Sequence, residues 1–335
     1  KNDYQNLVDE FIQVDVCNSL SFRKDVKVIF QVRSLIKSRQ PDIIYCHSSK
    51  AGGIGRIANI GIGIPLVYNP HGWAFNMKDT GIKSCVYLWL ERLLSPLTSQ
   101  YVTISNYEKQ SAIQHRVVKA DKMKVIFNGI DMDAVDKIVK SSTVTRVSLN
   151  IPKEAYLIGM VGRISKQKAP DVFIRVAASL KNIFPDVWFM IVGDGEQRGD
   201  VERMIKESGL EGRVVITGWV DNPAAYSCLF DQAVLLSRWE GFGLVLVEYM
   251  KLGKPIVATE ADAIPDLITD HENGLLVAVD NVEQAVNAIV EIRNDMSLKN
   301  RLVENGMLRA HAFFYVQRVV REHESLFLKI YKSFK

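Results

Sequence analysis

The stretch Glu240-Gly-Phe-Gly-Leu-Val-Leu-Val-Glu248 joins an apolar strand to an apolar helix. Residues 232–237 (QAVLLS) are typical of a buried strand, and the three residues after Glu240 are typical of a turn. A helix is predicted from Leu244 until Gly253-Lys254-Pro255 ends it. Glu240 is therefore expected in the turn and Glu248 a little over one turn into the helix. The backbone N–H groups near residues 243–245 are expected to point outward between the two carboxylates.

This arrangement predicts a particular kind of ligand. The amino end of a helix offers unpaired N–H groups and the positive end of the helix dipole, which together favour phosphate. A carboxylate on either side cannot bind that phosphate, but each carboxylate can accept hydrogen bonds from hydroxyl groups. The ligand is expected to carry hydroxyls at both ends and a diphosphate in the middle, as a nucleotide sugar does.

Length and composition indicate a two-domain globular protein. The chain has 335 residues, of which 47% are apolar and 24% charged, enough for two hydrophobic cores. Its four cysteines lie apart, at Cys17, Cys46, Cys85 and Cys228, which favours a reducing compartment over a disulfide frame or zinc cluster. No apolar run approaches the roughly 18 residues of a spanning helix, and no signal peptide is visible. A cytoplasmic location is predicted.

The positive charge is concentrated in the first part of the chain. Residues 1–130 hold 17 Lys and Arg against 10 Asp and Glu, whereas the whole chain has a net charge of +4. This excess favours an anionic surface, either the inner membrane face or a phosphate-bearing acceptor. Ordinary solvated surface charge explains it equally well. Nucleic acid is not expected as a partner, because no basic helix or aromatic-studded sheet motif is present.

Strands alternate with helix-length segments in both halves, which predicts parallel, doubly wound α/β sheets. In the first half, strands are expected at 43–45, 66–68, 100–104 and 125–127, and helices at 52–60 and 84–94. In the second half, strands are expected at 156–161, 187–192, 213–217, 232–236, 255–258 and 275–277, with helices at 170–183, 200–208, 244–252, 264–268 and 282–294. The polar stretch 136–153 is expected to be a linker.

These elements predict two Rossmann-like domains facing a cleft. The expected boundaries are 1–145 for an acceptor-side domain and 146–312 for a nucleotide-sugar-binding domain. A helical segment at 313–335 is expected to pack back on the first domain. A doubly wound domain normally opens with a strand and a Gly-rich turn, and neither is visible at Lys1-Asn2-Asp3. That first strand is either cropped or absent.

Gly162-Arg163-Ile164-Ser165-Lys166-Gln167-Lys168 follows the first strand of the second half. Gly162 permits close backbone approach, and two cations emerge at the carboxyl end of the strand, the ligand side of an open α/β sheet. Arg163 and Lys168 would neutralise a diphosphate leaving group as charge develops on it. The simpler alternative, a pair of surface cations, is disfavoured by the two glutamates described above.

The pattern resembles the GT-B glycosyltransferases, in particular the large retaining family four, over residues 40–330. Glu240 and Glu248 match that family's Glu-x7-Glu element, and the resemblance implies that they hold the sugar and ribose hydroxyls respectively. Gly162, Arg163 and Lys168 match its diphosphate-binding Gly-Arg…Lys-Gly element, with Ala169 where Gly is usual. The remaining donor-binding residues implied by the resemblance are Gly193, Asp194, Trp219, Val220, Gly241, Phe242, Gly243 and Leu244.

Two histidines in the first half follow predicted strand ends. The resemblance places His71 in the cleft beside the transferred sugar or the acceptor hydroxyl, although a lone histidine is often structural. His47 and Lys50 precede a helix start that would either cradle an anionic acceptor or simply be a capped helix entry.

Asp131-Met132-Asp133 spells the Asp-x-Asp motif that holds a metal in other sugar transferases. It lies after a first-half strand, and Arg163 and Lys168 already supply cations for the diphosphate. No metal or other cofactor is expected, and activity should survive EDTA. A glycosidase is not expected either, because its two carboxylates must face one another across the scissile bond.

The predicted reaction moves a sugar from a nucleoside diphosphate sugar, UDP being the expected nucleotide, to an acceptor hydroxyl with retention of configuration. The resemblance points to surface-polysaccharide assembly and a saccharide or lipid-linked acceptor, with possible peripheral contact at the inner membrane face. The apolar helix at 84–94 suits such contact, but a core helix is the simpler interpretation. A nucleotide-sugar epimerase and a noncatalytic binding partner of the same fold remain alternatives.

Overall fold

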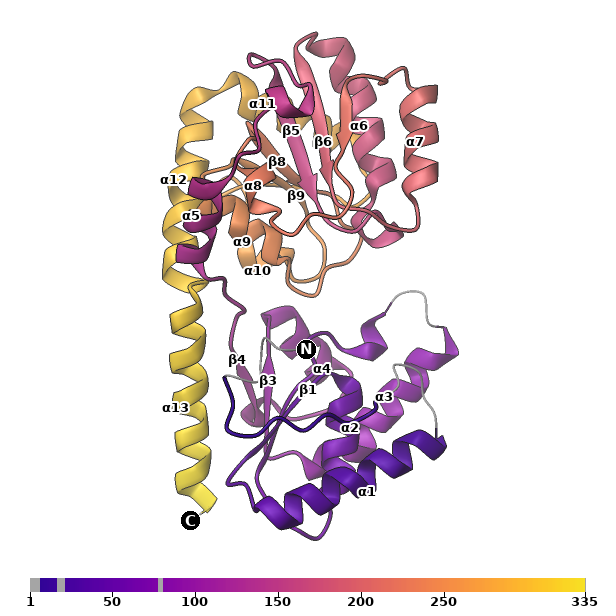
Figure 1. The fold of residues 1–335 in the computed structure, drawn as a ribbon, viewed down its shortest axis with the longest axis vertical. Helices are drawn as coiled ribbons and strands as arrows, with labels where there is room; N and C mark the ends of the chain where they lie inside the picture. Colours follow the sequence, from indigo (N-terminus) through magenta and orange to yellow (C-terminus); the bar gives the residue numbers. More distant parts are fainter. Residues whose placement is uncertain (1–6, 17–21, 78–80, 335) are drawn as a thin grey trace. The chain divides into compact units, whose positions relative to one another are not determined.

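The computed structural model describes residues 7–16, 22–77 and 81–334; Lys1-Asn2-Asp3, on which the missing-strand expectation depends, lie outside them. The chain divides into two compact units (Figure 1). The first contains residues 1–104, 108–125 and 324–335, and the second contains 105–107 and 126–323. The main division falls at Val125/Ile126, earlier than the expected boundary at 145/146.

The first unit is built on a four-stranded parallel sheet with the strands in chain order. Its strands are β1 (Ile44–His47), β2 (Leu66–Asn69), β3 (Gln100–Thr103) and β4 (Met123–Val125). The middle strands are almost entirely buried, as expected for a parallel sheet covered on both faces. The predicted strand at 125–127 was displaced by two residues, because Met123 rather than Phe127 pairs with β3.

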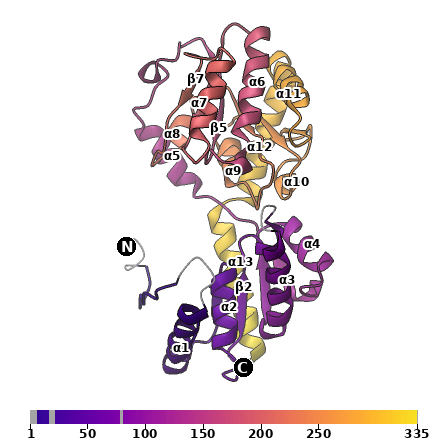
Figure 2. The same cartoon turned by 90° about the vertical axis from the view of Figure 1, so that its right-hand side faces the viewer.

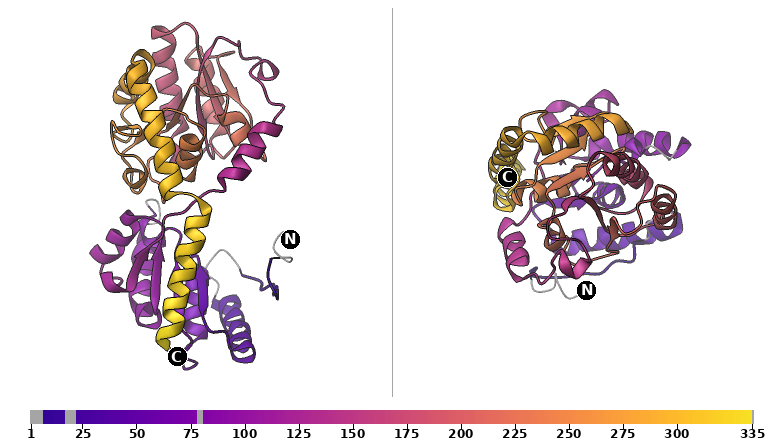
Figure 3. Two further views of the ribbon diagram at one scale, coloured as in Figure 1. Left: turned by 90° about the vertical axis from the view of Figure 1, so that its left-hand side faces the viewer. Right: turned by 90° about the horizontal axis from the view of Figure 1, so that it is seen from above.

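The helices of the first unit are α1 (Phe22–Arg39), α2 (Ser49–Ala58), α3 (Ile82–Leu94) and α4 (Asn106–Gln114). Strands in sequential order with right-handed crossovers place α2 and α3 on one face of the sheet. The end of α13 (Val316–Phe334) covers the first unit's other face (Figure 3). Its side chains Leu326 and Ile330 are buried there, and the ring of Phe327 lies 5.1 Å from that of Tyr45. Helix α1 packs on α2.

The second unit contains a six-stranded parallel sheet in the order β10-β9-β8-β5-β6-β7. Its strands are β5 (Tyr156–Val161), β6 (Val187–Val192), β7 (Val214–Ile216), β8 (Gln232–Leu235), β9 (Ile256–Thr259) and β10 (Leu275–Val277). The chain runs outward from β5 in one direction and from β8 in the other. The strand order therefore reverses between β5 and β8, which is where open α/β sheets bind ligands.

The helices of the second unit follow this reversal. They are α5 (Met132–Ser141), α6 (Pro170–Ile183), α7 (Arg198–Glu207), α8 (Ala224–Ser227), α9 (Leu244–Lys251), α10 (Ile264–Leu267), α11 (Val282–Asn294) and α12 (Met296–Phe313). Right-handed crossovers put α6 and α9 on opposite faces, where α6 packs with α7 and α11, and α9 packs with α12 (Figure 2). The doubly wound fold class predicted from the sequence is confirmed.

The expected linker at 136–153 is wrong in its first part. Asp131 caps the amino end of α5 by accepting a hydrogen bond from the Ala134 N–H, and α5 packs on α8. Helices α1, α4 and α12 were not predicted either.

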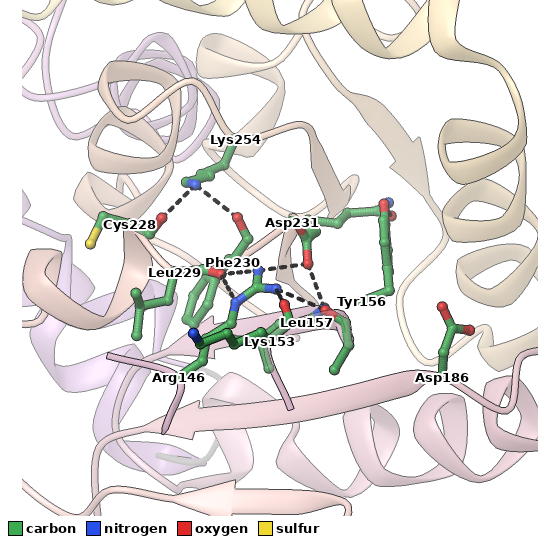
Figure 4. Close-up of polar contacts among 12 residues, drawn as sticks. Arg146, Lys153, Tyr156, Leu157, Asp186, Cys228, Leu229, Phe230, Asp231 and Lys254 are labelled. Atoms are coloured by element: carbon green, nitrogen blue, oxygen red, sulfur yellow. Dashed lines mark hydrogen bonds and ion pairs between the residues drawn. The ribbon is translucent and has the colours of Figure 1, made fainter. Parts of the chain in front are cut away.

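The later part of that stretch is fixed to the second sheet by Arg146 (Figure 4). Its guanidinium donates to the carbonyls of Leu229, Lys153 and Ala155 and to the Asp231 carboxylate at 2.8 Å. Asp231 also accepts from the N–H of Leu157, in β5.

Lys254 completes the network by donating to the carbonyls of Cys228 and Phe230, both at 2.7 Å. We call Arg146, Asp231 and Lys254 the amino-end clamp, because they join the chain at the amino ends of β5, β8 and β9.

Candidate donor site

Glycines bring the loops after β5 and β6 into backbone contact. A Cβ at Gly193 would lie 2.2 Å from the carbonyl oxygen of Gly162, and one at Gly195 would lie 2.3 Å from that of Ile164. Real Cβ atoms do not approach so closely, so only glycine fits at either position. Neither position can carry a side chain, so the peptide groups of these two loops approach one another directly at the carboxyl end of the sheet.

Lys168 and Glu240 meet at this edge although 72 residues separate them. The Lys168 ammonium donates to Glu240 Oε2, and their side chains are only 17% and 10% exposed. The Ser237 hydroxyl lies 3.3 Å from the same oxygen, and the N–H of Glu240 donates to Asp262 Oδ2 at 3.1 Å. The pair therefore holds a cation and a carboxylate in fixed positions at the point where the strand order reverses.

Further contacts join the loop after β5 to the loop after β8. The Gln167 side chain donates to the carbonyl of Trp239, and the N–H of Arg238 donates to the carbonyl of Gln167. Arg238 also pairs with Asp171 and Asp280, each at 2.7 Å. These supporting residues were missed at the sequence level, since nothing local distinguishes Gln167 or Arg238 from ordinary loop residues.

Glu248 is the second carboxylate of the site and lies on α9. Gly243 begins that helix with φ 90°, a left-handed conformation that glycine adopts without strain. Among the described residues, no side chain caps the amino end of α9, and the Glu248 carboxylate has no hydrogen-bond or ion-pair partner. Burial raises the pKa of Glu248 above its usual value. The neighbouring Tyr249 hydroxyl accepts from the N–H of Val161 and fixes α9 to the end of β5.

The structure brings several other predicted donor residues to the same edge. The aliphatic stem of Lys168 lies over Gly162, where an added Cβ would be 3.3 Å away. Gly193 forms a bridge to Gly218, the residue before the exposed Trp219 and half-buried Val220. Asp194 accepts from the N–H of Gly195.

Two predicted residues depart from the simplest expectation. Arg163 is exposed and forms its ion pair with Glu196, at 3.0 Å. The ring of Phe242 is buried against Phe127 and Phe314, so only its backbone is available to a donor. Gly241 and Leu244 lie at the entrance to α9, where Leu244 is exposed.

In the first unit, the two predicted histidines contact each other. His47 Nδ1 lies 2.7 Å from His71 Nε2, and their rings stack at 5.0 Å. His71 has a left-handed φ of 52°, held by a hydrogen bond from its own N–H to the Asn69 side chain. Lys50 pairs with Asp25, which was not predicted.

Glu108 is hydrogen-bonded to the loop that contains His71. Its buried carboxylate accepts from the backbone N–H groups of Ile104 and Gly72, and burial raises its pKa to about 7. Its carbonyl also accepts from the indole of Trp73.

Both aspartates of the Asp-x-Asp sequence have structural partners. Asp131 caps α5, and Asp133 accepts from the Tyr315 hydroxyl at 2.7 Å. Within the described residues, no group of three or more His, Cys, Asp and Glu side chains is arranged to hold a metal ion.

Comparison with known proteins gives a consistent result. Two family models match, Glycosyltransferase Family 4 over residues 1–134 and Glycosyl transferases group 1 over residues 141–309. UDP-Gal:alpha-D-GlcNAc-diphosphoundecaprenol alpha-1,3-galactosyltransferase of Escherichia coli is 30% identical over 295 residues, covering 87% of this chain and 76% of that protein.

Solved structures agree. HepE of Anabaena, crystallised with UDP, is 25% identical with a TM-score of 0.78, covering 91% of this chain and 82% of that one. Sucrose-phosphate synthase of Thermosynechococcus elongatus shares the fold at 21% identity, with a TM-score of 0.80 over 95% of this chain and 81% of that one.

Two parallel α/β units of Rossmann-like type, with a cation and two carboxylates on the elements that follow the reversal of the second sheet, are typical of a GT-B glycosyltransferase, as the solved structures confirm. Within that class, the chain belongs to glycosyltransferase family four. The predicted resemblance and the predicted enzyme class are confirmed, and the epimerase and the noncatalytic binding partner are set aside.

Proposed function

We propose that the enzyme transfers a sugar from a UDP-sugar to a hydroxyl of a lipid-linked saccharide, with retention of anomeric configuration and without a metal. The observation that carries the proposal is Glu248. Partial burial of a carboxylate without a partner among the described residues costs free energy, because the charged form loses water. A ligand that donates hydrogen bonds to it would offset this cost, and ribose hydroxyls are suitable donors.

The other donor-site residues support the same ligand. The Lys168 ammonium, the N–H groups at the start of α9 and, with a turn of its side chain, Arg163 would surround the diphosphate. Glu240 would accept from sugar hydroxyls, while the loops at Gly193-Asp194 and Trp219-Val220 would flank the nucleobase.

In the transfer step, the bond between the anomeric carbon and the diphosphate oxygen breaks, and a bond from that carbon to the acceptor oxygen forms. The leaving diphosphate carries the negative charge that develops, which Lys168 and the α9 amides stabilise. The acceptor proton passes to the leaving phosphate. His71, His47 and Lys50 would contact the acceptor side.

The names of two relatives support the acceptor class. The E. coli relative is named for an acceptor on diphosphoundecaprenol, as is an N-acetylgalactosaminyltransferase of Campylobacter jejuni that is 27% identical over 238 residues. An enzyme that acts on such an acceptor would work at the inner face of the cytoplasmic membrane, as a peripheral protein. In this respect the basic first part of the chain also favours an anionic surface.

The test combines binding and transfer. Thermal shift with a panel of UDP-, GDP- and ADP-sugars should show stabilisation by a UDP-sugar, and Glu248→Gln should reduce it while the matched exposed variant Glu211→Gln does not. Transfer of the bound sugar to a diphospholipid-linked saccharide should proceed in EDTA and give a product of unchanged anomeric configuration by NMR. Loss of activity in EDTA, or inversion, would contradict the proposal.

A further inference from the structure

Helix α3 presents its apolar side to solvent. Ile82, Val86, Trp89 and Leu93 follow the spacing i, i+4, i+7 and i+11, which places all four on one side of a helix. Their exposed fractions are 85%, 45%, 61% and 56%. We call these four residues the α3 stripe. The core-helix interpretation is therefore wrong for this side, although Tyr87 and Leu88 do pack inward.

The acidic side chain of this helix points the other way. Glu91 is buried, where it accepts hydrogen bonds from Arg56 and from the Tyr68 hydroxyl, both at 2.9 Å. Helix α3 thus exposes the four apolar residues of the stripe and buries its only acidic side chain, the reverse of an ordinary surface helix. No carboxylate of α3 remains outside to repel an anionic surface.

Cations flank the stripe. Lys83 and Arg92 belong to α3 and are exposed. The Arg92 guanidinium donates to the carbonyl of His115 at 2.6 and 2.9 Å, which places the segment after α4 beside α3 (Figure 2). That segment adds the exposed Arg116 and Lys119.

We propose that the α3 stripe and its flanking cations form the surface by which this enzyme docks on a bilayer containing anionic lipids. A helix lying in a bilayer interface has an apolar side with tryptophan and aliphatic residues, bordered by lysine and arginine, as this one has. The proposal rests on the proposed function, since a lipid-linked acceptor lies in a membrane. No helix of the described residues is both long and apolar enough to cross one.

Charge decides between a bilayer and a protein partner. An apolar stripe alone would suit either, but four cations around it with no exposed acid on α3 complement a surface of anionic headgroups. A second copy of the same face would bring like charges together.

The test measures cosedimentation of the full chain with vesicles of phosphatidylglycerol and phosphatidylcholine. The variant Val86→Ser/Trp89→Ser/Leu93→Ser should lose at least about tenfold in partitioning, because three side chains no longer enter the interface. The matched control is Val147→Ser/Met296→Ser/Leu308→Ser, which removes three comparably exposed apolar side chains of the second unit. It should bind as wild type.

A second variant isolates the charges. Lys83→Gln/Arg116→Gln should weaken binding to anionic vesicles by about fivefold for each cation and leave binding to pure phosphatidylcholine unchanged. A fluorophore on the exposed thiol of Cys85, in a Cys17→Ser/Cys228→Ser background, should shift to the blue on vesicle binding.

The outcomes separate this proposal from the proposed function. Membrane docking is overturned if the wild-type protein does not bind the vesicles, or if the triple serine variant of the α3 stripe still binds them. A dimer in wild type that the serine variant abolishes also overturns it, since the stripe would then be an interface between copies. Vesicle binding without any sugar transfer overturns only the proposed function. Transfer to a water-soluble acceptor analogue should be equal in wild type and serine variant, which also shows that the variant is folded.

Discussion

The two ends of the second sheet hold polar clusters of opposite character. At the amino ends of the strands, the donors of Arg146 and Lys254 reach carbonyl oxygens or the Asp231 carboxylate. At the carboxyl ends, Lys168 forms an ion pair with one carboxylate, that of Glu240. Glu248 has no partner among the described residues. Most buried polar groups of a protein are hydrogen-bonded, and an ionisable group without a partner is a candidate for ligand binding. The completed cluster is therefore assigned a structural role, and the incomplete one is the proposed donor site.

The largest expected effect is on turnover, at the carboxyl end. Lys168→Met should lower kcat by about 10²–10³-fold, because it removes a cation from the developing charge of the leaving diphosphate. Single-turnover transfer measures the loss. Lys166→Met, a neighbouring exposed lysine, should retain activity. A change below tenfold in Lys168→Met would remove this residue from the catalytic group.

The next effect belongs to the amino end and concerns stability. Arg146→Met should lower the free energy of unfolding by about 3 kcal/mol, since it leaves Asp231 without its cation and three carbonyls without this donor. Denaturant unfolding measures this change. Below the transition, kcat and KM should equal those of wild type. Lost activity in a folded Arg146→Met protein would mean that the two ends are not separate in role.

Glu248→Gln should weaken binding of the donor about tenfold by removing a charged acceptor, measured by titration with the UDP-sugar. The same substitution should make the protein more stable than wild type once the pH is high enough to ionise Glu248. Burial raises the folded-state pKa of Glu248, so its carboxyl stabilises the fold below the unfolded-state pKa and that contribution is lost as pH rises through the folded-state value. Wild type should therefore lose stability over this window relative to Glu248→Gln. Identical pH profiles would contradict the assigned environment.

The sequence predicted the second sheet well, and three of the proposed donor residues, Gly162, Lys168 and Glu240, do lie together at its carboxyl end. Both signals are local. Gly162 with Lys168, and Glu240 with Glu248, lie within eight residues of one another on either side of a turn. The pairing of Lys168 with Glu240 was not predictable, since it depends on β5 lying beside β8. The outward side of α3 was also missed. When nearly every residue of a helix is apolar, periodicity cannot show which side meets solvent, and only the pairing of Glu91 with Arg56 decides it.

The smallest expected effect is on stability and concerns a left-handed backbone residue near each end of the sheet. Ala169 follows Lys168 in a left-handed conformation, φ 49° and ψ 50°, and is fully buried. Near the clamp, the left-handed position is occupied by Asn150, a residue that tolerates it. The left-handed conformation of Ala169 costs about 1–2 kcal/mol, which glycine would avoid. Glycine also makes the unfolded chain more flexible, and this lowers stability by about 0.4–1 kcal/mol.

Ala169→Gly should therefore raise the free energy of unfolding by about 0.5 kcal/mol, measured by denaturant unfolding. Ala178→Gly, in the middle of α6, is the control and should lower it by about 1 kcal/mol. Equal losses in the two variants would show that the backbone at Ala169 is unstrained. A gain in Ala169→Gly with unchanged kcat would show that the strain beside Lys168 is not needed for transfer, and that the family's usual glycine relieves it.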